Sequence, residues 1–391
     1  MAIYLDHGAT TPTDPRVVEA MRPYFGEAFG NASSLHAFGQ EARAAVDRAR
    51  ALLARALGAR PADVVFTSGA TEADNWAVIG CALANEDRGR HIVVSAIEHH
   101  AVLEPARWLG ERGWEITVLP VDRHGRVDPD EVRRAVRDDT VLVSVMHSNN
   151  EIGTLQPVAE IARVAKERGA LVHTDATQSF GAIPIDVDDL GVDLLSASAH
   201  KRYGPKGVGL LYVRKGTRIA PLLRGGSQER GRRAGTQNVP DIVGFARAIE
   251  IALDERGVEQ ARIAALRDRL VAGLSEIEAM TYNGHPTERL PNNANVSFLG
   301  TESESVLMAL DMRGIAASSG SACTSGSLEP SHVLTAIGLA PEVAVGTVRF
   351  TLGRWTTAEE VDETVRAMRE IVPQLRAASP LWRARRPTLT S

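Results

Sequence analysis

Residues 196–209, Ser-Ala-Ser-Ala-His-Lys-Arg-Tyr-Gly-Pro-Lys-Gly-Val-Gly, place Lys201 between two apolar runs. Residues 192–195 lead into it and residues 207–213 follow it, so a buried strand is predicted on each side. Lysines are rarely buried without a partner, and an amine serves as a covalent catalyst only when it is partly desolvated and aimed. We therefore interpret Lys201 as an amine that carries a cofactor. Lys206, in a Gly-Pro-Lys-Gly turn, is interpreted as a solvated loop lysine.

The bulk composition excludes several classes of protein. A chain of 391 residues can form a large domain and a smaller one. Its net charge of −5, from 44 basic and 49 acidic residues, favours neither nucleic acid nor an anionic membrane as a partner. Two cysteines, Cys81 and Cys323, can form neither a disulfide framework nor a four-cysteine metal site. The N-terminus lacks a signal-peptide pattern and no apolar run reaches spanning length, so we expect a cytoplasmic protein.

Strands and helices are predicted to alternate over residues 64–213, which is typical of parallel β-α-β units in an α/β fold. A long helix is expected over 38–57 and another over 241–278. The expected strands of this part are 64–67, 92–95, 115–120, 141–146, 171–175, 194–197 and 208–213. Further strands, at 295–298, 316–318 and 348–352, indicate a second and smaller α+β domain.

These elements divide the chain into four expected parts. Residues 1–15 form an N-terminal arm that packs with the small domain, and residues 16–257 form a large cofactor-binding domain. Residues 258–378 form the small C-terminal domain, which carries the loop of Cys323. Residues 379–391 are expected to be a disordered tail without an assigned role.

Polar residues follow several of the predicted strands, where the loops of an open parallel sheet collect ligand-binding groups. Ser-Gly-Ala-Thr-Glu at 68–72 comes between a strand and a helix, where free backbone N–H groups can bind a phosphate. Glu98-His99-His100 lacks a further Cys or His at metal-ligand spacing, so no metal site is predicted. A ring that stacks on a flat cofactor or moves a proton is one interpretation of His99, and a surface pair is the other. A polar cluster at 147–151 follows the next strand.

Asp175 ends an apolar strand, where a carboxylate is costly unless it meets a cation. A protonated pyridine nitrogen would be such a cation. A strand-end aspartate together with Lys201 is what pyridoxal phosphate enzymes require, namely an amine for the Schiff base and a carboxylate that keeps the ring an electron sink.

From Tyr4 to beyond Arg354 the chain resembles the cysteine desulfurases of the class V aminotransferase group. The motifs that carry the resemblance occur in family order: Ser-Gly-Ala-Thr-Glu (68–72), Glu-His (98–99), Asn-Asn-Glu-Ile-Gly (149–153), Asp-Ala-Thr-Gln (175–178), His-Lys-Arg-Tyr-Gly-Pro-Lys-Gly (200–207), Arg-Arg-Ala-Gly-Thr (232–236) and Ser-Ser-Gly-Ser-Ala-Cys (318–323). The resemblance implies a pyridoxal phosphate-dependent transferase of fold type I, aspartate aminotransferase-like, with a large mostly parallel sheet domain and a smaller α+β domain.

The resemblance also implies the roles of the cofactor-binding residues. Lys201 would hold pyridoxal 5'-phosphate, Asp175 would pair with the ring nitrogen, Gln178 would bond the phenolic oxygen and His99 would stack on the ring. The phosphate would be bound by Ala70, Thr71, Ser198 and His200. Thr236 would reach the phosphate of a neighbouring subunit, which implies a homodimer with shared active sites.

Three residues are expected on the substrate side: Asn31, Asn150 and Arg349, of which Asn150 also belongs to the cofactor set. Arg349 lies within Thr-Val-Arg-Phe-Thr-Leu-Gly, an apolar strand in which an arginine is otherwise hard to explain. A guanidinium is suited to the carboxylate of an amino acid, since it can donate two parallel hydrogen bonds.

Cys323 is expected to be a second nucleophile. Residues 318–327 contain almost no apolar side chain, so this segment is predicted to be mobile and exposed. Cys81, in the apolar run 78–83, is assigned to the core. A mobile thiol can enter a site, take a group and carry it out.

The reaction implied is the conversion of L-cysteine to L-alanine, with Lys201, Cys323 and His99 as catalytic residues. Lys201 would move a proton from the α-carbon, and the Cys323 thiolate would attack the substrate sulfur and keep it as a persulfide. The stretch from Cys323 to His332 is of the longer kind in this family. Such forms look suited to direct sulfur transfer to an acceptor, either an iron–sulfur scaffold or a tRNA-thiolation enzyme.

Other interpretations stay open at this point. A selenocysteine lyase, a cysteine sulfinate desulfinase or a class V aminotransferase would share the fold, and the last would not need Cys323. A non-catalytic scaffold would be expected to lack Lys201, Asp175 or Arg349. A nucleic-acid-binding regulator is disfavoured by the net charge.

Overall fold

The main sheet has seven strands in the order β2-β8-β7-β6-β5-β3-β4. A computed structural model describes residues 2–319 and 331–385, so Cys323 and the last six residues of the chain lie outside the described residues. The strands of this sheet are β2 (Val64–Thr67), β3 (His91–Ser95), β4 (Glu115–Leu119), β5 (Thr140–Ser144), β6 (Leu171–Asp175), β7 (Leu194–Ser198) and β8 (Gly209–Val213). All seven were expected from their apolar runs, and their ends agree to within two residues.

The sheet is mostly parallel, as predicted, with one exception. β7, β6, β5, β3 and β4 run parallel, whereas β8 is antiparallel to both of its neighbours, β2 and β7. The expectation of parallel β-α-β units was wrong for β8. Residues 199–208 connect it to β7 through a single 3-10 turn, Ala199–Lys201, and parallel neighbours would need a longer crossover, usually a helix.

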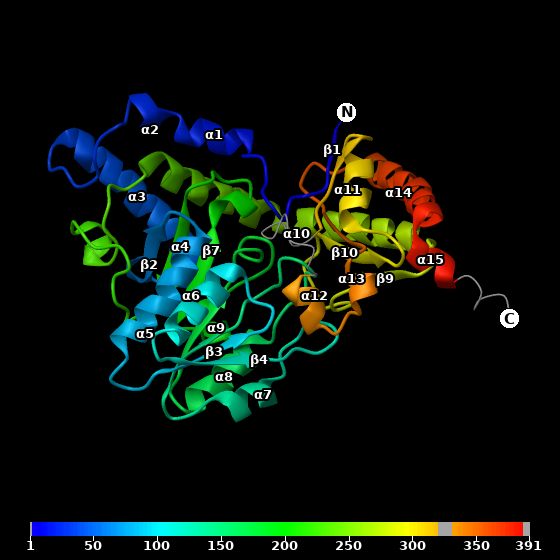
Figure 1. The fold of residues 1–391 in the computed structure, drawn as a ribbon. Helices are drawn as coiled ribbons and strands as arrows, with labels where there is room; N and C mark the ends of the chain where they lie inside the picture. Colours follow the sequence, from blue (N-terminus) through cyan, green and yellow to red (C-terminus); the bar gives the residue numbers. More distant parts are fainter. Residues whose placement is uncertain (1, 320–330, 386–391) are drawn as a thin grey trace.

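Helices cover the sheets on their outer faces (Figure 1). Those of the first 275 residues are α1 (Pro15–Met21), α2 (Pro23–Gly26), α3 (Ala37–Ala56), α4 (Ala70–Asn75), α5 (Cys81–Ala84), α6 (His100–Gly110), α7 (Pro129–Ala135), α8 (Val158–Glu167), α9 (Val187–Leu190) and α10 (Val239–Ser275). They are followed by α11 (Ser303–Asp311), α12 (His332–Ala336), α13 (Pro341–Ala344), α14 (Ala358–Ala378) and α15 (Pro380–Arg385). The π-turn η2 (Trp76–Gly80) joins α4 to α5, and η1 (Pro61–Asp63), η3 (Ala199–Lys201) and η4 (Gln228–Gly231) are 3-10 turns.

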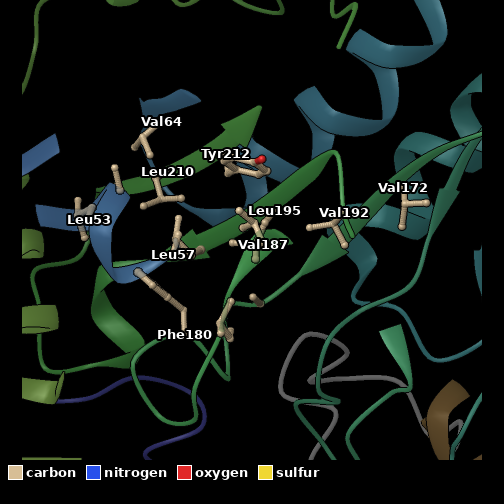
Figure 2. Packing of buried hydrophobic residues seen from close by; sticks show 14 of the residues in the cluster. Leu53, Leu57, Val64, Val172, Phe180, Val187, Val192, Leu195, Leu210 and Tyr212 are labelled. Carbon is tan, nitrogen blue, oxygen red and sulfur yellow. The ribbon is translucent and has the colours of Figure 1, made fainter. Parts of the chain in front are cut away.

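Apolar side chains are buried on both faces of the main sheet. In β8, Leu210 and Tyr212 join the cluster with Leu53 of α3, whereas Leu211 and Val213 belong to the cluster on the opposite face. Figure 2 shows the first of these clusters from close by. Burial on both faces explains why the strands are continuous apolar runs in the sequence, and why their positions were predictable.

A second unit is built on a three-stranded antiparallel sheet, ordered β12-β10-β9: β9 (Met280–Asn283), β10 (Asn293–Phe298) and β12 (Thr347–Thr351). β9 was not expected, because the helix expected over 241–278 reached almost to its first residue and three of its four residues are not buried. Helix α10 packs against α3 of the main unit and α14 of the second one, as Figure 1 shows. The four-part division of the chain into domains stays a prediction.

The N-terminal arm crosses from the second unit to the main sheet. Its strand β1 (Ile3–Tyr4) pairs in parallel with β11 (Ile315–Ala316), and Asp6 forms a bridge with Thr351. Further along, the Gly8 N–H donates to Thr351 Oγ1 at 2.6 Å. The arm is therefore fixed on the small sheet immediately before the residues that reach Lys201. In the described ranges, no helix is long and apolar enough to cross a bilayer.

Candidate active site

A cavity of about 520 Å³ lies where the main sheet, the N-terminal arm and β12 meet. Ten of the residues predicted from the sequence line it: Ala70, Thr71, His99, Asn150, Asp175, Gln178, Ser198, His200, Lys201 and Arg349. Most of these follow the carboxyl ends of β2, β3, β5, β6 and β7. The cavity thus forms at the sheet edge at which ligands bind in open α/β folds.

Lys201 is held by the N-terminal arm. It ends the 3-10 turn that follows β7, and its Nζ donates to the carbonyl oxygens of Gly8 and Ala9, both at 2.7 Å. Gln178 Nε2 donates to the same Gly8 oxygen at 3.0 Å. The arm therefore aims the amine, and Lys201 is only partly exposed, as its apolar flanks predicted.

Asp175 is the last residue of β6 and is 6% exposed. Its Oδ1 accepts a hydrogen bond from the Thr177 backbone N–H at 2.8 Å. The backbone that follows the strand thereby fixes the orientation of this carboxylate at the cavity wall. A cationic ring nitrogen in the cavity would find there the counter-charge that a buried carboxylate requires.

The turn at 68–72 offers backbone donors to the cavity. Gly69 precedes α4 and no side chain of the described residues caps the helix, so its first N–H groups are available to an anion. Gly209 makes this possible, because a Cβ at this position would lie 2.7 Å from the backbone carbon of Gly69 and 2.6 Å from the Ala197 oxygen. The bare glycine lets the turn approach β8 closely.

His200 lies beside the same turn as a neutral ring. Burial, together with the charges of Lys201 and Lys206, lowers the pKa of His200 to about 4. Its Nδ1 is 3.1 Å from Thr10 Oγ1, which connects it to the N-terminal arm. A neutral His200 can serve a phosphate as a hydrogen-bond donor rather than as a charge.

His99 is the N-cap of α6. Its Nδ1 accepts a hydrogen bond from the Ala101 N–H at 3.1 Å, so this nitrogen carries no proton and a neutral ring is protonated on Nε2. Burial lowers the pKa of His99; Asp175 opposes this shift, whereas Lys201 and His100 add to it. The ring is therefore a neutral imidazole with a defined tautomer at the cavity wall.

Arg349 reaches the cavity from β12 and is 2% exposed. One terminal nitrogen donates to Asp6 Oδ1 and the other to the Asn150 carbonyl oxygen, each at 2.9 Å. Its Nε has no hydrogen-bond partner in the part of the chain that the structure describes. The side chain is thus anchored while donor capacity remains for a carboxylate ligand.

Two predicted site residues, Asn31 and Thr236, do not line this cavity, and a third, Cys323, cannot be placed. Asn31 is exposed and its Oδ1 accepts from the Ser33 N–H at 2.9 Å within its own loop. Thr236 is exposed in the loop that precedes α10. Cys323 falls in the stretch 320–330, outside the described residues.

Asp74 is a cavity residue that sequence reasoning missed. It lies on the buried side of α4, is 1% exposed, and neither of its carboxyl oxygens has a hydrogen bond within the described ranges. Its Oδ1 is 3.5 Å from Nε2 of His173. An acid inside a helix whose neighbours Ala73, Trp76 and Ala77 are apolar is the signal that could have revealed it.

Asp74 and Glu98 form an acid cluster next to Asp175. Burial, with the nearby charge of Asp175, raises the pKa of Asp74 well above its ordinary value. Burial also raises the pKa of Glu98 to about 8, although Ser95 Oγ and the Met146 N–H donate to its Oε1. Like charges in one buried space oppose each other's ionisation, which adds to the effect of burial on the pKa values of Asp74 and Glu98.

Comparison with known proteins gives one consistent result. The model of the family "Aminotransferase class-V" matches residues 3–364. A cysteine desulfurase IscS from Methanosarcina thermophila is 54% identical over 380 residues, which cover 97% of this chain and 94% of that protein. One from Dictyoglomus turgidum is 52% identical over 379 residues, covering 97% and 96%.

Comparison with solved structures gives the same result as comparison of the sequences. A "NifS-like protein" superposes with a TM-score of 0.90 at 41% identity, covering 95% of this chain and all of that one. A structure titled "SspA in complex with cysteine" superposes with a TM-score of 0.80 at 37% identity, covering 91% of this chain and all of that one. A lysine, an aspartate and a backbone anion site around one cavity define the pyridoxal phosphate-dependent class of fold type I. The chain belongs to the class-V aminotransferase family.

The cavity fits the cofactor of this family, pyridoxal 5'-phosphate. Thr177 Oγ1 and Ser148 Oγ, both on its wall, are buried without a hydrogen-bond partner among the described residues. Unpartnered buried polar atoms are costly, and a polar ligand would satisfy them. Together with the uncapped turn at 68–72, they form a set of donors suited to a phosphorylated ring.

Proposed function

We propose that this protein is a cysteine desulfurase, which converts L-cysteine to L-alanine and leaves the sulfur as a persulfide on Cys323. The observation that supports this most is that relatives with 54% and 52% identity over 97% of the chain bear that name. The convergence of Lys201, Asp175 and Arg349 on one cavity supports it independently, because these are the groups that amino-acid chemistry on pyridoxal phosphate needs.

Pyridoxal phosphate, when bound, supplies the electron sink that makes the bonds at the substrate α-carbon labile. Lys201 Nζ would hold the cofactor, Asp175 would face the ring nitrogen and His99 would lie against the ring. Gln178 would bond the phenolic oxygen. The phosphate would be bound by the turn at Ala70 and Thr71 with Ser198 and His200.

The residues of the chain would have three separate roles: binding the substrate, moving its protons and accepting its sulfur. Arg349, with Asn31 and Asn150, would bind the carboxylate and orient the α-carbon. Lys201 Nζ would take the proton from that carbon, and His99 Nε2 would hold or return a proton at the cavity wall. The thiolate of Cys323 would attack the substrate sulfur: an S–S bond forms, the C–S bond breaks, and its electron pair stays with the carbon skeleton that leaves as alanine.

The proposed assembly is a homodimer with shared active sites, in which Thr236 of each chain reaches the other chain's cofactor phosphate. The exposure of Thr236, away from the cavity of its own chain, supports this arrangement. So does a group of exposed apolar side chains: Phe29, Leu35 and Phe38 are 65%, 86% and 53% exposed. The sulfur acceptor would be an iron–sulfur scaffold or a tRNA-thiolation enzyme, and a cytoplasmic location stays a prediction.

Product analysis with matched variants tests this function. We expect the purified protein with pyridoxal phosphate, L-cysteine and a reductant to release alanine and sulfide in equal amounts. Cys323→Ser should lose both products, whereas Cys81→Ala should retain them, because Cys81 is fully buried in the core. Full activity of Cys323→Ser with cysteine would contradict the mechanism. Alanine formed from selenocysteine or cysteine sulfinate but not from cysteine, or transamination alone, would assign the site to those reactions instead.

A further inference from the structure

A buried carboxylate ties the loop of residues 228–237 to the main sheet. Glu229 is 8% exposed and its partner Arg50, on α3, is 5% exposed. Glu229 Oε2 accepts from Arg50 at 2.6 Å and from the Phe66 N–H of β2 at 3.1 Å. Its Oε1 accepts from Arg50 at 2.7 Å and from Gln237 Nε2 at 2.5 Å. One side chain thus joins a helix, a strand and both ends of the loop.

The ion pair is ionised in spite of its burial. Burial acts to raise the pKa of Glu229, but the hydrogen bonds and charge of Arg50 lower it below its ordinary value. Arg50 is fixed in turn, because it also donates to the Val64 carbonyl oxygen at 2.8 Å and lies over the Phe66 ring. A buried pair with all these bonds is rigid, and removal of either partner leaves an uncompensated charge.

The backbone of the loop is strained at two residues. Glu229 has φ and ψ of 48° and 38°, and Arg230 has 59° and 37°, so two consecutive non-glycine residues are left-handed. Such residues persist where surrounding contacts over-determine them, and they cluster at functional segments. In this loop, the hydrogen bonds of the Glu229 side chain hold the strained backbone in place. A strained segment that is held by a buried ion pair indicates that the function of the protein requires this particular conformation of the loop.

The same loop carries Thr236, next to Gln237. A second anchor lies on its other side, where Arg233 donates to both oxygens of Glu72 at 2.8 and 3.0 Å. Glu72 belongs to the turn at 68–72, and its Oε2 also accepts from the Ser68 N–H. Between these anchors Thr236 is exposed and does not line the cavity of its own chain.

We propose that Arg50 and Glu229 are positioning residues that fix the loop 228–237, so that Thr236 is presented to the cofactor phosphate of a second copy of the chain. This rests on the shared-site homodimer proposed above. Its consequence is specific: loss of the ion pair damages cofactor binding in the partner's site and not in the site of the altered chain.

Cofactor affinity is the first readout. We expect Thr236→Val and Glu229→Gln each to weaken pyridoxal phosphate binding about tenfold, the effect of a lost hydrogen bond to a charged group. Affinity is measured as the fraction of chains with cofactor fixed on Lys201 by borohydride, against cofactor concentration, on protein shown to be dimeric by sedimentation. Asp362→Asn, which breaks the exposed pair with Arg269, is the matched control and should leave the affinity unchanged.

Mixed dimers with differently tagged chains separate the two sites. In the first, one chain carries Glu229→Gln with Lys201→Ala and the other is unaltered, so the single intact Lys201 faces the altered loop. In the second, one chain carries Glu229→Gln and the other Lys201→Ala, so the single intact Lys201 faces an unaltered loop. We expect weak binding in the first and normal binding in the second.

The outcomes are distinguishable. Equal weakening in both mixed dimers, or normal affinity of Glu229→Gln beside a weakened Thr236→Val, would overturn the positioning role while leaving the shared site intact. Normal affinity of Thr236→Val would instead refute the shared site. If Glu229→Gln fails to fold, Arg50→Lys replaces it in the same dimers, because a lysine keeps the positive charge beside Glu229 but cannot make both of the hydrogen bonds that Arg50 donates.

Discussion

At the scale of single residues, the site depends on which of several neighbouring groups carries a charge. Asp74, Glu98 and Asp175 are all buried near one cavity wall, and burial favours the protonated form of the first two. His173, between Ser144 Oγ and Ser196 Oγ, is neutral because complete burial lowers its pKa to about 3. Asp175 is the carboxyl group of this cluster that we propose faces the ring nitrogen of the cofactor.

The protonation of Asp74 predicts a pH dependence of stability. The pKa of Asp74 in the folded protein is raised above its value in the unfolded chain. Its contribution to the free energy of unfolding is therefore fully present below about pH 4 and is lost as the pH rises toward the folded-state pKa. Relative to Asp74→Asn, which cannot titrate, the wild type should therefore lose stability by up to about 1.4 kcal/mol per pH unit above pH 4. Denaturant unfolding of both proteins between pH 4 and 7 measures this. A constant difference would show that Asp74 is ionised in the folded protein.

Substitution of Arg349 should weaken substrate binding without changing cofactor binding. Its planar guanidinium donates hydrogen bonds to Asp6 and to the Asn150 carbonyl oxygen. A lysine ammonium cannot make both of these bonds and also bind a carboxylate. Arg349→Lys should raise the KM for L-cysteine about tenfold or more while the absorbance of the bound cofactor stays unchanged. Steady-state kinetics and a cofactor titration check this, with Arg313→Lys, at an exposed pair with Glu370, as control. An unchanged KM would remove Arg349 from the substrate site.

At the scale of elements, two glycines should respond in opposite ways to the same substitution. Gly209→Ala would force its Cβ against backbone atoms of Gly69 and Ala197, so it should separate α4 from β8 and weaken both folding and cofactor affinity. At Gly257, within α10, an added Cβ would meet no atom within 4 Å among the described residues, apart from its chain neighbours and the nearby backbone of its own helix. Gly257→Ala should therefore stabilise the protein by about 1 kcal/mol and leave the affinity unchanged. Thermal unfolding and cofactor titration test both. A Gly209→Ala protein with normal affinity would contradict the account of the turn.

The elements themselves were largely predictable from the sequence. Strands buried on both faces form apolar runs, and helix starts carry local signals: Asp128 accepts from the Asp130 N–H, and the capping box Thr357–Glu360 has both of its bonds. The direction of β8 was not predictable from its own residues, since it is decided by how residues 199–208 connect it to β7. Asp74 was missed because its significance comes from Asp175 and His173, which are adjacent to it only after folding.

At the scale of the whole molecule, the cavity exists because three distant segments meet. The arm supplies the carbonyl oxygens that hold Lys201, the main sheet supplies the residues that we propose bind the cofactor, and β12 supplies Arg349. β12 also holds Ser318 through two backbone hydrogen bonds with Arg349, of 2.6 and 3.1 Å. Ser318 therefore lies beside Arg349, two residues before the stretch that contains Cys323.

The chemical state of Cys323 after turnover shows whether this residue accepts the sulfur. The cofactor-loaded protein is mixed with L-cysteine without reductant, quenched and digested, and the peptides with Cys323 and Cys81 are examined by mass spectrometry while alanine is quantified. We predict one additional sulfur atom on the Cys323 peptide, in amounts that match the alanine released in the first turnover, and none on the Cys81 peptide. Alanine release with an unmodified Cys323 would contradict the assignment of this residue as the sulfur-accepting nucleophile.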